Sequence, residues 1–248
     1  MTHIAAPPLP TGLEWANVAT LRMDQQHGRP VLIEFWDFCR PNSLRTLPYI
    51  KAWHERYEPE GLRVIGVHSP GFEPSRDPDA VRAAVARLEV PYAVAIDSDL
   101  EVWKLYENLG WPARYLFNQE GYLFEYHYGE GAYEETELAI QELLGVTRPP
   151  LEPLREQDVP GARLALPSED VAGPYSGPYE AGGAWAVLDG NGWVRANSRE
   201  IPVAYPGAYE LLSHRYSTAG TLELELSPGV RCYAVCLTPG LAPPGRAG

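Results

Sequence analysis

Cysteine is the residue with the widest chemical scope in this chain, and it occurs at three positions: Cys39, Cys232 and Cys236. A thiolate can attack a disulfide, bind a metal ion or be oxidised, and a helix N-terminus or a neighbouring cation lowers its pKa. Cys39 precedes Arg40 and a helix-like stretch, so it stands where a thiolate would be stabilised. It has no second cysteine within one helical turn, which dithiol chemistry needs to resolve a mixed disulfide.

Short apolar runs alternate with helix-like stretches on both sides of Cys39, and these elements must position it. The predicted elements are strands at 31–36, 62–68 and 90–97, helices at 43–57, 79–89 and 100–109, a hairpin of 113–118 and 122–128, and a closing helix at 134–144. This order predicts an α/β domain whose mostly parallel sheet has helices on both faces. Pro48 predicts a kink in the first helix.

The pattern changes after the closing helix. Prolines without periodicity predict a surface connector, and alternating apolar residues then predict a small all-β module. In that module, two strands flanking Gly190-Asn191-Gly192 predict a hairpin. The expected organisation is an N-terminal tail (1–12), an α/β domain (13–146), a Pro-rich connector (147–178), a small β module (179–240) and a C-terminal tail (241–248).

Cys232 and Cys236 lie four residues apart on the last predicted strand. Strict alternation would point both side chains to one face, about 13 Å apart, which is too far for a disulfide. We interpret them as buried core thiols. The alternative is that one of them reaches Cys39 and acts as its resolving cysteine.

The segment EFWDFCRPNSLRTLPYIKAWHERY at 34–57 resembles the active-site segment of thioredoxin-like proteins of the TlpA/DipZ-like type. The resemblance continues at VIGVHSPGF (64–72) and over 90–144, about half of the chain. It implies a thioredoxin fold, a central mixed sheet flanked by helices, followed by a small C-terminal β module. It also implies descent from thiol–disulfide oxidoreductases, with a cis peptide bond at Trp111-Pro112.

The flanking residues of this resemblance fix its register. Phe35-Trp36 on one side and the LRTLP run on the other place the family's two catalytic cysteines at Arg40 and Ser43, so the CxxC pair is degenerate. Glu34 falls where the family often has a buried acid beneath the pair. We expect Glu34 to be buried, with its pKa raised by desolvation and a hydrogen bond to Ser43, or else to make a structural hydrogen bond at the sheet edge.

Cys39 itself supports two interpretations. It is either a semi-buried thiol in a place where thioredoxins often have an aromatic residue, or a shifted monothiol site whose pKa Arg40 lowers. The groove residues implied by the resemblance are Trp36, Trp111 and Pro112. The leading hypothesis is binding of a peptide or protein partner in this cis-Pro groove without dithiol turnover. The alternative is a monothiol oxidoreductase or thiol redox sensor that uses Cys39.

Composition excludes several other classes. A net charge of −13 disfavours nucleic acid and anionic membrane surfaces, and no run approaches the roughly 20 apolar residues of a membrane span. The sequence contains no metal-ligand spacing and no phosphate-binding loop, so neither a metal nor a cofactor is expected. Trp185, Trp193 and Tyr209 of the β module could stack on a sugar, although carbohydrate binding is not favoured. Few cysteines and no secretory leader predict a cytoplasmic location.

Overall fold

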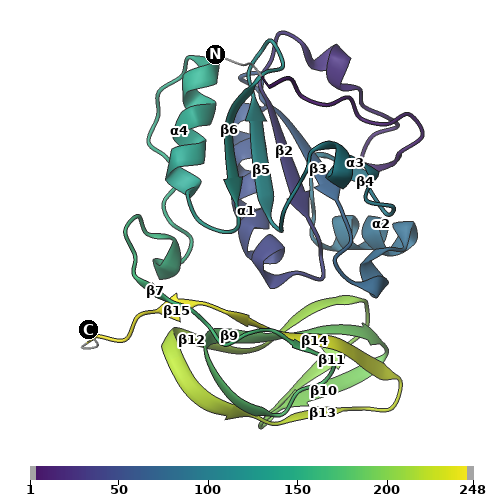
Figure 1. Ribbon diagram of the computed structural model, residues 1–248, viewed down its shortest axis with the longest axis vertical. Coiled ribbons are helices and arrows are strands. Elements are labelled where there is room, and N and C mark those ends of the chain that lie inside the picture. The colour runs from purple at the N-terminus through teal and green to yellow at the C-terminus, as the bar shows by residue number, and fades with distance from the viewer. Residues whose placement is uncertain (1–3, 245–248) are drawn as a thin grey trace. The chain divides into compact units, whose positions relative to one another are not determined.

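The computed structural model describes residues 4–244. The chain divides into two compact units, shown in Figure 1. The first unit comprises the residues up to Phe38 together with Asn42–Glu152, and the second comprises Cys39–Pro41 together with the residues from Pro153 onward. Parts of the two predicted tails, 1–3 and 245–248, lie outside the described residues.

A six-stranded mixed sheet forms the centre of the first unit, in the spatial order β1-β4-β3-β2-β5-β6. Its strands are β1 (Glu14–Ala16), β2 (Val31–Trp36), β3 (Arg63–His68), β4 (Ala93–Ile96), β5 (Ala113–Phe117) and β6 (Leu123–Tyr128). The central strands β2, β3 and β4 are parallel, whereas β1, β5 and β6 each pair antiparallel with their neighbours. The predicted α/β class is confirmed, with β1 as an unpredicted sixth strand.

Three helices connect strands of this sheet, namely α1 (Pro41–Tyr57), α2 (Pro78–Arg87) and α3 (Glu101–Leu105), and a fourth, α4 (Tyr133–Leu144), follows β6. Single 3-10 turns at Met23–Gln26 and Glu73–Ser75 complete the unit. Helix α1 continues through Pro48. Helix α3 is shorter than the predicted 100–109, because the left-handed backbone at Leu100 precedes it and that at Glu107 follows it.

The two faces of the sheet differ in chemistry. Val31, Ile33 and Phe35 alternate onto one face, where they join an apolar core that includes Tyr115 of β5. The opposite face of β2 carries Glu34, and α1 covers this face of the sheet. There the Arg114 guanidinium lies 5.7 Å from the ring of Trp53 in α1. Glu34 and Arg114 therefore lie on the face of the sheet beneath α1.

The second unit is all β apart from a 3-10 turn at Glu156–Asp158. Its strands are β7 (Leu164–Ala165), β8 (Val171–Ala172), β9 (Gly177–Gly190), β10 (Gly192–Ala196), β11 (Arg199–Val203), β12 (Gly207–Leu222), β13 (Leu224–Leu226), β14 (Val230–Thr238) and β15 (Gly240–Leu241). They form one sheet ordered β7-β15-β12-β9-β14-β8 and another ordered β11-β10-β13. Strands β7 and β8 lie within the predicted connector 147–178, so sheet structure begins earlier than the sequence pattern indicates.

The predicted hairpin around Gly190-Asn191-Gly192 is wrong. Strand β9 pairs with β12 and β14, whereas β10 pairs with β11 and β13, so this turn carries the chain from one sheet to the other. Gly190 and Gly192 both have positive φ. A Cβ on Gly190 would lie 2.0 Å from the Gly229 carbonyl oxygen, so glycine is required there for a close backbone approach.

Cys232 and Cys236 do not share one face, contrary to the prediction from strict alternation. A β-bulge between Cys232 and Ala234 shifts the register of β14 on β9, so that Cys232 pairs with Leu188 and Cys236 with Trp185. Cys232 consequently joins the apolar core, and Cys236 points to the opposite face of the strand. Both thiols are buried, and burial is the largest cause of raised pKa values of about 11 for Cys232 and about 12 for Cys236.

Candidate functional site

The segment that resembles a thioredoxin active site begins helix α1. Cys39 and Arg40 precede the helix, and Ser43 lies in its first turn. Cys39 and Ser43 are both 0% exposed, and Arg40 is partly exposed. None of the chain's three cysteines is in a disulfide. The Ser43 hydroxyl accepts a hydrogen bond from the Asp37 backbone amide at 3.2 Å, so its oxygen ties the end of β2 to α1.

Asp37 and His68 form a buried polar cluster beside this helix start, which the sequence analysis did not identify. Asp37 Oδ2 accepts a hydrogen bond from the Gly71 amide at 2.8 Å, and Oδ1 lies 3.5 Å from His68 Nε2. The His68 ring stacks on Phe38 with the ring centroids 5.0 Å apart. These contacts fix the loop between β2 and α1 and favour a structural role for His68. In the sequence, the indication of this cluster was the acidic Asp37 directly after an apolar strand.

Glu34 is fully buried, as predicted, and burial raises its pKa to about 8, so the side chain is protonated at neutral pH. Its partner differs from the prediction. Oε2 accepts a hydrogen bond from the Tyr92 hydroxyl at 3.2 Å, and Ser43 is bonded to Asp37 instead. Oε1 has no hydrogen-bond partner. A neutral carboxyl is the form that such an incompletely satisfied buried site tolerates.

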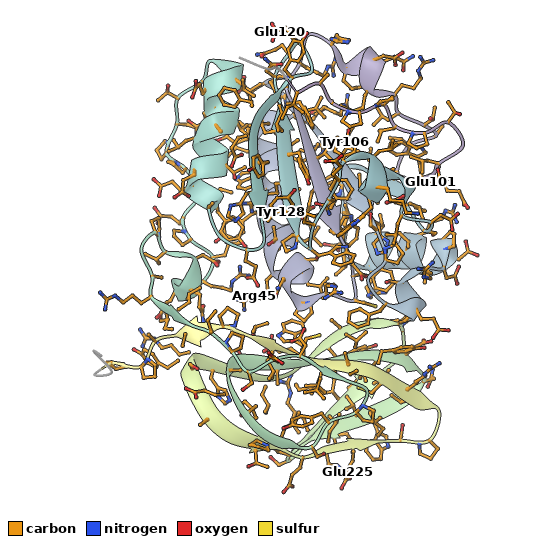
Figure 2. All side chains as sticks on the ribbon, in the orientation of Figure 1. Arg45, Glu101, Tyr106, Glu120, Tyr128 and Glu225 are labelled. Carbon is orange, nitrogen blue, oxygen red and sulfur yellow. The ribbon has the colours of Figure 1, made fainter. Side chains whose placement is uncertain are left out.

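Arg114 is the cation next to Glu34 in the sheet, because the two residues are directly paired between β2 and β5. Its charge opposes the rise in the Glu34 pKa, while burial lowers the pKa of Arg114 itself. The guanidinium donates to the Gly131 carbonyl at 2.6 Å and lies 5.1 Å from the Tyr133 ring centroid. Arg45, labelled in Figure 2, pairs with Glu130 at 2.8 Å and so links α1 to the same loop.

Trp36 lies in the interior, so it does not form a wall of the proposed groove in this structure. It is 0% exposed and contacts the His68 ring edge-on, with centroids 5.1 Å apart. A Cβ on Gly66 would lie only 3.0 Å from Trp36 Nε1. The lack of a side chain at Gly66 on the neighbouring strand therefore makes room for the indole.

Trp111 and Pro112 precede β5, and the peptide bond between them is cis. The half-buried Trp111 indole donates a hydrogen bond to the Ser69 carbonyl at 2.8 Å. Its ring packs on Trp103 of α3, with centroids 4.1 Å apart. Pro112 is buried, and its carbonyl accepts from the Gly129 amide. The loop before β5 is thus fixed by contacts to three other segments.

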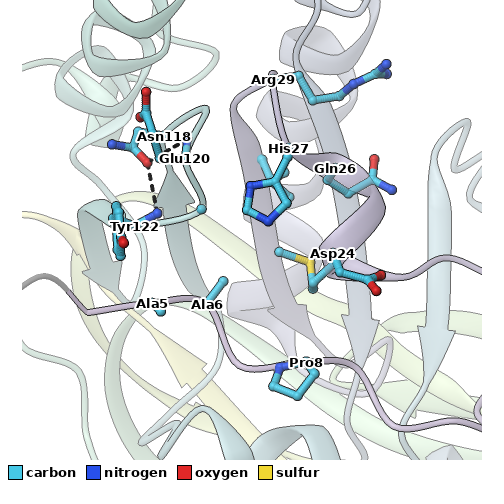
Figure 3. A pocket seen from close by; sticks show the side chains of 13 residues that line it. Ala5, Ala6, Pro8, Asp24, Gln26, His27, Arg29, Asn118, Glu120 and Tyr122 are labelled. Atoms are coloured by element: carbon cyan, nitrogen blue, oxygen red, sulfur yellow. Dashed lines mark hydrogen bonds between the residues drawn. The ribbon is translucent and has the colours of Figure 1, made fainter.

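A separate cavity of about 280 Å³ lies at the other end of β2, where Val31 begins the strand. Figure 3 shows its polar side chains, among them His27, Arg29 and Glu120, around walls that include Ala6. Val31 is at the opposite end of the strand from Trp36, so this cavity is distinct from the site at the helix start.

Three comparisons bear on this geometry. The chain is 33% identical over 147 residues to the protein DipZ of Mycobacterium tuberculosis, covering 58% of this chain and 21% of DipZ. It is 26% identical to the thiol-disulfide oxidoreductase YkuV of Bacillus subtilis, over 57% of this chain and 95% of YkuV. The solution structure of a thioredoxin-like protein in the oxidized form superposes with a TM-score of 0.53 at 25% identity, over 59% of this chain and 98% of that chain.

The first unit is a thioredoxin-like domain. Its sheet order, its helices and its likeness to these proteins agree, and the chain is homologous to DipZ and to thiol–disulfide oxidoreductases. The chain spans about a fifth of the length of DipZ. No protein-family model matches the chain. The expected C-terminal β module is present as the second unit. Across residues 4–244, helices are too short or too polar to span a bilayer.

Glu34 predicts a pH dependence of the thioredoxin-like domain's stability. The folded-state pKa is raised from 4.5 to about 8, so between these values the folded protein retains a proton that the unfolded chain has lost. The free energy of unfolding therefore falls as pH rises, by about 1.4 kcal/mol per pH unit from this group. Urea unfolding at several pH values should show this slope in wild type and its loss in Glu34→Gln. Equal slopes in the two proteins would contradict the assignment.

Proposed function

We propose that the thioredoxin-like domain binds an extended segment of a peptide or protein partner along the Trp111–Pro112 loop and does not pass electrons through a dithiol pair. The observation that carries this proposal is the pair of residues at the start of α1. In the register of the resemblance, Arg40 and Ser43 occupy the positions of the two catalytic cysteines. A guanidinium and a hydroxyl cannot form a disulfide, so the domain lacks the two-electron couple of the family.

The surroundings of positions 40 and 43 favour a structural role for this helix start over a catalytic one. Ser43 is buried and bonded to the Asp37 backbone, which is the contact of a residue that stabilises a helix start. The monothiol alternative, in which Cys39 attacks a disulfide or reacts with an oxidant, requires a cysteine that its substrate can reach and lacks a resolving partner within one helical turn.

The contacts of Trp111 support partner binding. An extended peptide binds through its backbone groups, and side chains beside it provide selectivity. The indole of Trp111 is held by Ser69 and Trp103, so it offers a preorganised apolar surface with little entropy left to lose on binding. The partner is therefore expected to place an apolar or aromatic side chain against Trp111.

The charge of the chain sets the class of partner and the expected location. A net charge of −13 favours a protein partner with neutral or basic character over nucleic acid or an anionic membrane surface. We propose a cytoplasmic location, because Cys39, Cys232 and Cys236 remain thiols and the chain relies on no disulfide.

Two measurements on the full chain test this function. In an insulin-reduction assay with dithiothreitol, the wild type should give no rate above background. Carboxymethylated insulin B chain, an extended polypeptide with blocked cysteines, should bind in a fluorescence-anisotropy titration. Trp111→Ala should weaken that binding by about tenfold, because a large aromatic contact is lost. Exposed Tyr205→Ala in the second unit is the matched aromatic control.

Three outcomes would overturn the proposal. These are insulin reduction by the wild type, absence of B-chain binding, and equal affinities of wild type and a folded Trp111→Ala variant. Alkylation of Cys39 by iodoacetamide in the native protein, at a rate that follows a pKa below the ordinary 8.5, would support the monothiol alternative instead.

A further inference from the structure

A groove of about 580 Å³ crosses the first unit between the end of α3 and the edge strand β6, on the sheet face opposite Glu34. This volume lies in the range of about 300–1,000 Å³ that holds small-molecule ligands. The groove is formed entirely by residues of the first unit and does not include Trp111 or Pro112. It therefore needs an explanation of its own, separate from the proposed partner site.

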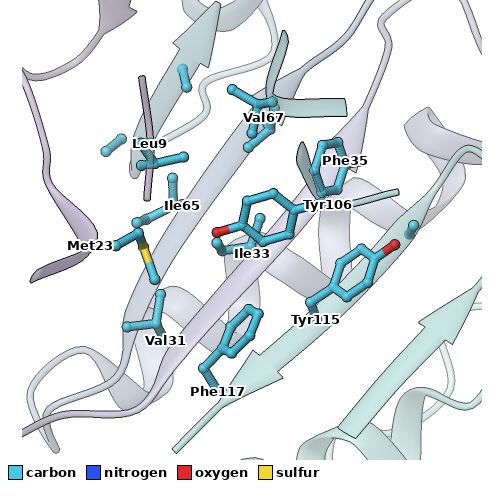
Figure 4. Packing of buried hydrophobic residues seen from close by; sticks show 14 of the residues in the cluster. Leu9, Met23, Val31, Ile33, Phe35, Ile65, Val67, Tyr106, Tyr115 and Phe117 are labelled. Atoms are coloured by element: carbon cyan, nitrogen blue, oxygen red, sulfur yellow. The ribbon is translucent and has the colours of Figure 1, made fainter. Parts of the chain in front are cut away.

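The floor of this groove is rigid and aromatic. Tyr106, Tyr115 and Phe117 are buried, and Figure 4 shows their rings beside one another in the apolar core. Tyr106 and Tyr115 have centroids 5.8 Å apart, and Tyr106 and Phe117 6.2 Å apart. Their hydroxyls are engaged, since Tyr106 donates to the Pro7 carbonyl and Tyr115 to Asn108. The floor thus presents fixed ring surfaces to a ligand.

The rim of the groove is unusually apolar for a protein surface. Leu109 is 82% exposed and Tyr126 57% exposed, and Ile4 and Leu105 are also exposed large apolar residues that line it. Tyr128, labelled in Figure 2, hydrogen-bonds Tyr115 at 2.8 Å, and its ring lies 5.7 Å from that of Tyr126. A cluster of exposed leucine and tyrosine side chains at a concave surface is typical of a binding site.

The charge of the groove selects the kind of ligand. Among the described residues that line it, Glu107 is the one acidic or basic side chain. Glu107 is exposed and lines the groove, and its backbone adopts a left-handed conformation directly after Tyr106. Tyrosine ring faces attract cations through their quadrupole, and Glu107 adds a full negative charge in a chain whose net charge is −13.

We propose that this groove binds a quaternary ammonium cation. The methylated ammonium head contacts the faces of Tyr126 and Tyr128 beside Glu107, and the substituent chain of the cation lies toward Leu105 and Leu109. The proposal does not depend on the function of the Trp111–Pro112 loop, because it uses other residues.

Choline and its uncharged carbon isostere 3,3-dimethylbutan-1-ol test this proposal. Titrations of the full chain carrying ¹³C-labelled tyrosine rings should show saturable shifts at Tyr126 and Tyr128 with choline, with a dissociation constant of about millimolar. The isostere should bind about tenfold more weakly, since it lacks the charge that Glu107 and the rings recognise.

Two variants distinguish recognition of the ligand's positive charge from apolar contact alone. Tyr126→Leu keeps apolar bulk but removes a π face, and Glu107→Gln removes the charge. Each should weaken choline binding about threefold and leave binding of the isostere unchanged. Glu120→Gln, an exposed acid outside the groove, is the matched control for charge.

Equal affinity for choline and the isostere overturns the proposal in favour of a general apolar groove. An absence of saturable shifts at Tyr126 and Tyr128 overturns it as well. If the Tyr126 and Tyr128 ring signals shift with protein concentration when no ligand is added, the groove is a face for self-association. That result would also contradict the proposed ligand.

Discussion

The double substitution Arg40→Cys and Ser43→Cys is expected to give this chain disulfide reductase activity. The rate of insulin reduction with dithiothreitol should rise by about tenfold or more over the wild-type background. The reason is positional. Residue 40 directly precedes α1 and residue 43 lies in its first turn, so the two sulfur atoms would stand one turn apart at a helix N-terminus. The positive end of the helix stabilises the first as a thiolate.

The burial of Ser43 suits its replacement by cysteine. A resolving thiol is needed only within the protein, and the Ser43 side chain is 0% exposed. The cost of the substitution is the hydrogen bond that Ser43 accepts from the Asp37 amide, about 1 kcal/mol. That loss is small against the stability of an ordinary domain, so the variant should fold.

Cys39 must be absent from every protein in this comparison, because its thiol could form a mispaired disulfide with the new cysteine at position 43. The double variant should therefore be made in a Cys39→Ser background, with the two single replacements as controls. Each single variant should remain near background, since a lone thiol lacks a resolving partner. An inactive double variant that is folded and fully reducible would contradict the register that places the family's cysteines at 40 and 43.

The layout of the first unit could be predicted because its strands are short, apolar and bounded by turn residues. Strand β2 was predicted with its observed bounds, Val31–Trp36, and α4 differs by one residue at its start. Strand β1 was not predicted. Its three residues, Glu14–Ala16, are too few for a periodicity, and their place on the sheet edge depends on pairing with β4, about 80 residues later.

The second unit shows where local patterns fail. Gly190-Asn191-Gly192 has the composition of a hairpin turn, but the turn connects two sheets, because partners for β9 are supplied by β12 and β14. The register shift between Cys232 and Ala234 likewise has no sequence mark, and it moves Cys236 to the opposite face from Cys232. Long-range pairing decides both features, and a window of a few residues contains no information about it.

The residues of the candidate site could be predicted from the sequence, whereas their contacts could be predicted less well. Burial of Glu34 followed from its place within an apolar run, but its hydrogen bond to Tyr92 joins residues 58 positions apart. The interior position of Trp36 depends on Gly66 of the neighbouring strand. The groove between α3 and β6 was missed for a similar reason, since it is made by side chains that the fold brings together from Ile4 to Tyr128.

Glu137 of α4 should have one of the largest effects on the stability of the first unit. The side chain is 1% exposed, and Oε2 accepts hydrogen bonds from Trp53 Nε1 at 3.1 Å and from the Leu151 amide at 2.8 Å. Oε1 accepts from the Tyr57 hydroxyl at 2.6 Å and lies 3.0 Å from the Arg56 guanidinium. One carboxylate thus fixes α1 against α4 and the segment that follows α4.

Glu137→Leu should lower the free energy of unfolding by about 3–5 kcal/mol, because several buried donors and a cation lose their acceptor together. Glu137→Gln should cost less, about 1–3 kcal/mol, since one carbonyl oxygen remains to accept. The measurement is urea unfolding followed by tryptophan fluorescence, to which Trp53 contributes, with far-UV circular dichroism as a second probe of the same transition.

Glu142→Leu is the matched control, because Glu142 lies on the same helix and is exposed; it should change the free energy of unfolding by less than about 0.5 kcal/mol. The contrast between the two positions is what identifies the cause. If Glu137→Leu is as stable as the control, the buried carboxylate contributes nothing net. Its replacement by an apolar side chain of similar volume would then have offset the lost hydrogen bonds, as happens at some buried ion pairs.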